Sequence, residues 1–76
     1  MKRSEFNLAI EQEFGPGYGS VVVNDLVLPG LGGRTGAEAL ADGVAPRDVW
    51  LAICRETDVP EARRHGAGRP VPGERR

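Results

Sequence analysis

Apolar side chains recur at helical spacing in the first part of the chain. They form one stripe over nearly three turns, which is typical of a helix packed on one side. Ser4 is a good N-cap residue before the stripe, and Gly15-Pro16-Gly17 is a strong termination signal after it. The pattern predicts a helix over about 5–14, whose stripe comprises Phe6, Ala9, Ile10 and Phe14.

The next segment, residues 18–28, is apolar without a regular alternation. Its valines favour a strand by intrinsic propensity. As a helix, the segment would be apolar around most of its circumference, which suits a central helix packed on several sides. Because no partner strand is visible elsewhere in the chain, we predict a helix, with a partly extended segment as the open alternative.

Residues 35–57 carry clear signals for two further helices. Thr35 and Glu38 match a capping box at the start of a helix over 37–42, and Gly43 suits its C-terminal end. Pro46 suits the first position of a helix running to about residue 57. This arrangement has the spacing of a helix-turn-helix unit. Val59-Pro60 interrupts it, and residues 61–64 could add one further turn.

These elements together predict an all-α fold. We expect a small irregular bundle of four short helices, or five with the last turn, that contains a helix-turn-helix-like unit. Residues 1–64 would form the folded domain. Residues 65–76 are basic and contain Gly and Pro, so we expect a disordered C-terminal tail.

The formal net charge of −1 is unevenly distributed. Residues 1–62 contain five basic and ten acidic side chains, whereas residues 63–76 contain five arginines and one glutamate. An acidic body is poorly suited to phosphate contacts, so nucleic-acid binding is not the favoured function of the helices. The basic tail keeps such binding open as an alternative.

Few residues in the chain could carry catalysis or hold a metal ion. Cys54 is the only cysteine and His65 the only histidine, so a four-ligand zinc site is excluded. The only lysine is Lys2, which excludes a phosphate-binding loop of the Gly-Lys-Ser/Thr type. We expect no catalytic site, no cofactor and no small-molecule substrate. The apolar runs are too short to span a membrane, and we expect a cytoplasmic protein.

Two groups of residues are candidate binding surfaces. Gly32, Gly33, Arg34 and Thr35 precede a helix, so they could hold an anion or form a turn in which Arg34 pairs with a carboxylate, for which Asp25 is our choice. Leu51 is predicted to project from its helix between Arg47 and Arg55, which makes these three residues a candidate contact for a partner. Trp50 is predicted to be a buried core residue.

The sequence also resembles a known family. The motifs are Ser4-Glu5-Phe6, Glu13-Phe14-Gly15, Asp25 to Leu28, Leu31 to Thr35, Glu38-Ala39-Leu40, Gly43-Val44, Pro46 to Trp50 and Asp58-Val59-Pro60. They are similar to those of the actinobacterial domain of unknown function DUF3046, over residues 1 to about 64. The resemblance implies an intracellular actinobacterial protein and supplies no activity, cofactor or catalytic residue. It implies a link to DNA repair by gene association only.

Our hypothesis from the sequence is a small helical module that binds another protein through Arg47, Leu51 and Arg55. The alternative is a nucleic-acid-binding helix-turn-helix protein assisted by the basic tail. We favour the first hypothesis, because an exposed apolar residue between two basic ones on an otherwise acidic domain is suited to contact a partner.

Overall fold

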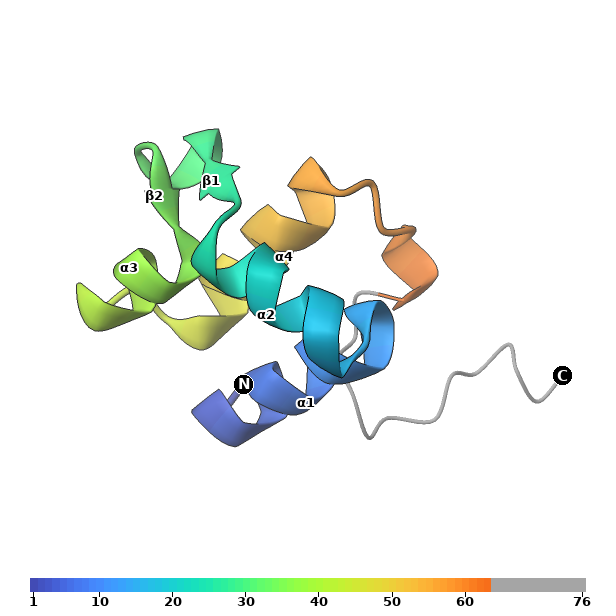
Figure 1. Cartoon of the computed structure of the whole chain (residues 1–76). Helices are drawn as coiled ribbons and strands as arrows, with labels where there is room; N and C mark the ends of the chain where they lie inside the picture. The colour runs from blue at the N-terminus through green and yellow to red at the C-terminus, as the bar shows by residue number, and fades with distance from the viewer. Residues whose placement is uncertain (64–76) are drawn as a thin grey trace, which may run out of the picture.

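The computed structural model describes residues 1–63 of the chain, and the predicted tail lies outside the described residues. The elements in chain order are α1 (Arg3–Phe14), α2 (Pro16–Asn24), β1 (Val27–Leu28), η1 (Pro29–Leu31), β2 (Arg34–Thr35), α3 (Gly36–Ala41), α4 (Pro46–Glu56) and η2 (Glu61–Arg63). Figure 1 shows α2 crossing over α1, with the short strands and α3 grouped at the opposite end of the molecule from η2. The fold is mostly helical, as predicted, with four α-helices in the described part of the chain.

The helix α1 begins two residues earlier than the sequence predicts. The backbone N–H of Lys2 donates to Oε1 of Glu5 at 2.7 Å, and the N–H of Phe6 donates to the carbonyl oxygen of Lys2 at 2.9 Å. These bonds make Lys2, not Ser4, the N-cap residue. A glutamate in the first turn therefore provides the cap that the sequence analysis assigned to a hydroxyl.

A single residue separates α1 from α2. Gly15 has a φ of 88°, which a residue with a side chain rarely adopts, and it ends one helix and begins the next. Pro16 then occupies the first turn of α2, where its missing N–H costs no hydrogen bond. The Gly15-Pro16-Gly17 motif therefore ends α1, as predicted, and also starts α2.

The all-α prediction is wrong in one place, because the described residues include a two-stranded antiparallel sheet. Val27 pairs with Thr35 and Leu28 with Arg34, on either side of η1. The predicted helix over 18–28 therefore ends at Asn24 as α2, and its last part is extended. The open alternative of the sequence analysis applies to these two residues.

The second half of the fold follows its local signals closely. The N–H of Gly43 donates to the carbonyl oxygen of Leu40 at 3.1 Å, and that of Val44 donates to Ala39 at 3.0 Å. This is the Schellman arrangement, and the φ of 95° at Gly43 provides its left-handed residue. The turn brings α4 against α3, with Pro46 in the first turn of α4.

The core is formed by residues from all four α-helices, from β1 and from the segment after α4. Trp50 is buried, as predicted, together with residues from every part of the described chain. The buried hydrophobic residues are Phe6, Ala9, Ile10, Val22, Leu28, Ala39, Val49, Trp50, Ala52, Ile53, Cys54 and Val59.

The last described segment contacts α1 through an ion pair. After α4, Asp58 adopts a φ of 60°, and the N–H of Val59 donates to the carbonyl oxygen of Cys54 at 2.9 Å. This turn buries Val59 and leads into η2, the single further turn anticipated after Pro60. Arg63 then pairs with Glu13, with Nη2 and Oε2 3.0 Å apart and Nε 3.2 Å from both carboxylate oxygens.

Candidate functional site

Arg34 makes its contacts within its own part of the fold. Its Nε donates to the carbonyl oxygen of Leu31 at 2.9 Å, and its Nη1 lies 2.9 Å from Oδ2 of Asp42. The predicted partner, Asp25, is wrong: it is exposed at the C-terminal end of α2. Arg34 instead pairs with the carboxylate at the far end of α3, because β2 leads directly into that helix.

The remaining residues of this motif form a turn and a helix cap. Gly32 and Gly33 both have a positive φ, of 73° and 80°, between η1 and β2. The N–H of Glu38 donates to Oγ1 of Thr35 at 3.1 Å, and Glu38 accepts from the N–H of Thr35 at 2.9 Å. The capping box is therefore confirmed. Because the motif already satisfies its own polar groups, the turn interpretation accounts for it without a bound anion.

The second candidate surface lies on the outer side of α4. Arg47 and Arg55 are exposed and two helical turns apart, about 12 Å along the helix axis. Within residues 1–63, neither guanidinium group forms an ion pair. Leu51, between them, is half-buried and packs against the core. The expectation that Leu51 projects freely is therefore wrong, and the charged part of this surface is its accessible part.

A small cleft adjoins the Arg55 end of this surface. It has a volume of about 140 Å³ and lies between α4 and the η1 turn. A Cβ atom built on Gly30 would lie 4.0 Å from Nη2 of Arg55, so the guanidinium group stands at the edge of the turn. The residues that line the cleft are Leu28, Pro29, Gly30, Ala52, Arg55 and Glu56. The cleft could accept one apolar side chain beside a carboxylate bound to Arg55.

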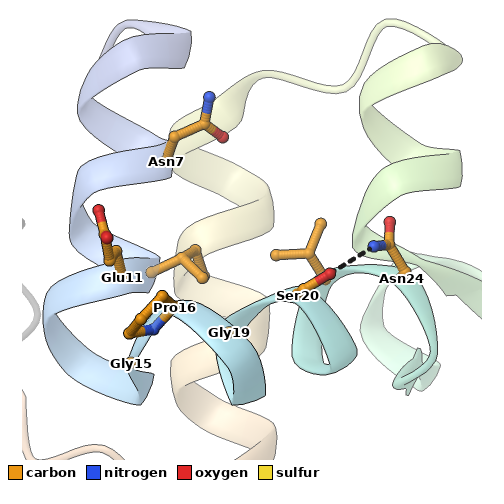
Figure 2. Close-up of a pocket in the computed structure, with 9 residues that line it drawn as sticks. Asn7, Glu11, Gly15, Pro16, Gly19, Ser20 and Asn24 are labelled. Carbon is orange, nitrogen blue, oxygen red and sulfur yellow. Dashed lines mark hydrogen bonds between the residues drawn. The ribbon is translucent and has the colours of Figure 1, made fainter.

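A larger groove, of about 290 Å³, lies between α1 and α2 (Figure 2). Its polar residues come from both helices, with Asn7 and Glu11 on α1 and Ser20 and Asn24 on α2. This groove was not predicted from the sequence. The available signal was Gly19, which allows α2 to approach α1 closely, but the position where two helices cross is not visible in a sequence.

Two residues singled out for possible chemistry were Cys54 and His65. Cys54 is buried within α4, and His65 lies outside the described residues. No group of three or more His, Cys, Asp or Glu residues within 1–63 is arranged to hold a metal ion. The buried side chains of this part of the chain are all apolar. Its charged groups are therefore available to solvent or to surface pairs.

Comparison with known proteins agrees with the resemblance seen in the sequence. A Mycobacterium tuberculosis protein named "Putative envelope-preserving system protein" is 47% identical over 49 residues, which are 64% of this chain and 16% of that protein. The chain thus corresponds to a small part of this relative. No solved structure matches the chain. Among the described helices, none combines the length and apolar character that crossing a membrane requires. The model of the family "Protein of unknown function (DUF3046)" matches residues 1–62, and the chain therefore belongs to the DUF3046 family.

Proposed function

We propose that this chain is a protein-interaction module that contacts a partner through the outer side of α4. The observation that carries this proposal is the pair of exposed arginines, Arg47 and Arg55, on one face of the helix. Neither is ion-paired within the described residues, whereas Arg34 and Arg63 are. A guanidinium group that the fold itself does not use is suited to a carboxylate of another molecule.

The apolar part of the proposed contact is shared between Leu51 and the cleft beside η1. Leu51 exposes only part of its side chain, so it supplies a shallow apolar surface between the two arginines. The cleft lies further along, at Arg55. A partner with acidic side chains and one apolar side chain for the cleft would match this arrangement. Asp48 and Glu56 are also exposed on α4 and would disfavour a uniformly acidic partner.

The comparison with the mycobacterial relative supports a module. A segment similar to this chain occurs within a protein about six times as long as the matched segment. A compact unit with its own hydrophobic core can fold inside a longer chain, and it can present a binding surface there. The name of that relative describes a system, and we propose that the partner belongs to such a multicomponent assembly. The link to DNA repair stays a prediction.

We also propose that the chain is not an enzyme, and this proposal rests on the surroundings of its polar side chains. A catalytic group in a small domain needs a sheltered, polar environment that shifts its reactivity. Within residues 1–63 the buried side chains are apolar, and both the cleft and the groove are open to solvent. This arrangement supports recognition of a surface more than chemical conversion of a bound molecule.

The test is quantitative affinity capture from the native organism with matched charge-reversal variants. The variant Arg47→Glu/Arg55→Glu changes the α4 surface, and Lys2→Glu/Arg3→Glu makes the same charge change on the remote, exposed start of α1. We expect a protein captured by the native chain and by the α1 variant, and lost with the α4 variant. Equal capture by all three chains would exclude this surface. Leu51→Asp is unsuitable, because it would disturb the core.

A nucleic-acid-binding function is the second candidate, and the α3–turn–α4 geometry is the observation that favours it. The Schellman turn at Gly43 sets α4 directly after α3, and Arg47 lies near the N-terminal end of α4, where a recognition helix presents side chains to DNA. Binding would fall steeply with salt concentration. Absence of binding to duplex DNA at about 50 mM salt would exclude this function.

A further inference from the structure

The groove between α1 and α2 combines an apolar floor with polar sides. Ile10 and Val23 contribute apolar surface, and the amide groups of Asn7 and Asn24 come from opposite helices. Asn24 Nδ2 donates to Oγ of Ser20 at 3.2 Å, as Figure 2 shows, which uses one of the two N–H groups of that amide. A side-chain amide presents a donor and an acceptor together, which matches the N–H and C=O of an extended peptide backbone.

Glu11 supplies a negative charge at one end of this groove. It is exposed, and within residues 1–63 no basic side chain pairs with it. Its neighbour Glu13, by contrast, is held by Arg63. Glu11 also lies in the last turn of α1, which contains no basic residue, although helix C-termini attract cations. The residues 1–63 contain ten acidic and six basic side chains, so the wider field also favours a cation.

The volume of the groove indicates whether it is suited to a small molecule or to a single side chain of a partner. Pockets for drug-sized ligands typically have volumes of about 300–1,000 Å³ and enclose most of the ligand. The groove, at about 290 Å³, is at the low end of this range and is open along its length. It is therefore suited to one long side chain and the short stretch of backbone that bears it.

We propose that this groove binds an arginine-bearing extended segment of a partner protein. The guanidinium group pairs with the carboxylate of Glu11, and its aliphatic part covers Ile10 and Val23. The side-chain amides of Asn7 and Asn24 bind the backbone of the segment on either side of the arginine. This site is distinct from the α4 surface in position and is opposite to it in charge, so the two sites would recognise different segments.

The test is an NMR titration of the ¹⁵N-labelled full chain with a defined peptide. The probe is an acetylated, amidated pentapeptide with a central arginine between pairs of glycines, and its control carries citrulline, which has nearly the same shape without the charge. We expect saturable shifts of the side-chain amide signals of Asn7 and Asn24 and of the backbone signals of Gly15 and Gly19. We expect the citrulline peptide to bind about three- to fivefold more weakly, because it lacks the charge that pairs with the exposed carboxylate of Glu11.

Two variants separate a specific site from general attraction to an acidic protein. Glu11→Gln should weaken binding of the arginine peptide by about three- to fivefold, the effect of losing an ion pair that solvent partly screens. Asp48→Asn makes the same charge change on α4 and should leave the affinity within about twofold. No saturable shifts in the groove, equal binding of the citrulline peptide, or equal losses in the two variants would each overturn the proposal.

Discussion

Gly19 and Ile10 mark the point where α1 and α2 touch: a Cβ atom on Gly19 would lie 2.8 Å from Cγ2 of Ile10 and 3.3 Å from its carbonyl oxygen. Real Cβ atoms essentially never show the shorter distance, so an alanine here would force either the Ile10 side chain or the two helices to shift. We expect Gly19→Ala to lower the free energy of unfolding by about 1–3 kcal/mol, the usual cost of overpacking. Urea unfolding followed by circular dichroism measures this change.

Gly17 provides the control on the same helix. A Cβ atom there meets no other atom within 4 Å. Because alanine is a better helix former than glycine, Gly17→Ala should raise the free energy of unfolding by about 0.5 kcal/mol. If the two substitutions changed stability equally, the close crossing of α1 and α2 would be wrong.

A second prediction concerns the contribution of the capping box at Thr35 to stability. Replacing Thr35 with alanine removes both its methyl group and its hydroxyl, and the hydroxyl is the acceptor for the N–H of Glu38 at the start of α3. Thr35→Ala should therefore cost about 1 kcal/mol of stability. Thr35→Ser retains the hydroxyl and should keep most of that energy. A serine variant as unstable as the alanine variant would mean that the methyl group of Thr35, and not its cap, is what matters.

The pair between Arg63 and Glu13 joins η2, the last described element, to the C-terminal end of α1. Its geometry is bidentate, but the Arg63 side chain is 56% exposed, so solvent screens the interaction. A double-mutant cycle with Arg63→Ala and Glu13→Gln should give a coupling energy of about 0.5 kcal/mol. The coupling should shrink between about 50 mM and 1 M salt, because mobile ions screen exposed charges. A coupling independent of salt would contradict an electrostatic origin.

Glu11 should behave differently from Glu13 in a stability measurement. Its negative charge lies in the last turn of α1, where the helix macrodipole disfavours it. Glu11→Gln should leave the free energy of unfolding unchanged or raise it by up to about 1 kcal/mol. Glu13→Gln should lower it, because it breaks the pair with Arg63. If Glu11→Gln were as destabilising as Glu13→Gln, Glu11 would have a structural role and the proposed arginine site would lose its main support.

The sequence predicts those parts of the fold that depend on near neighbours. The cap at Thr35 is made by a residue three positions away, and the turn at Gly43 by residues within five positions. Pro46 is tolerated in the first turn of a helix but disrupts a helix interior, so it predicts a helix start from its own residue type. The apolar stripe of α1 is equally local, and its residues are buried or half-buried as expected.

The errors concern contacts between segments whose relative position the sequence does not reveal. Val27 is extended because it pairs with Thr35 across η1, although its own neighbours favour no single state. Arg34 could reach several carboxylates, and only the folded chain shows that Asp42 is the near one. Leu51 is half-buried, although its spacing on α4 predicts exposure, because the outer edge of that helix still contacts the core.

The shared core of Phe6 and Val59 has a consequence for biosynthesis. Phe6 is synthesised 53 residues before Val59, yet both are buried in one cluster. An incomplete chain therefore exposes the apolar face of α1 until α4 has been synthesised, and it has no partial core of comparable size to shelter it. Premature termination within α4 should yield fragments that proteases remove quickly, so cells should contain the complete domain or none of it.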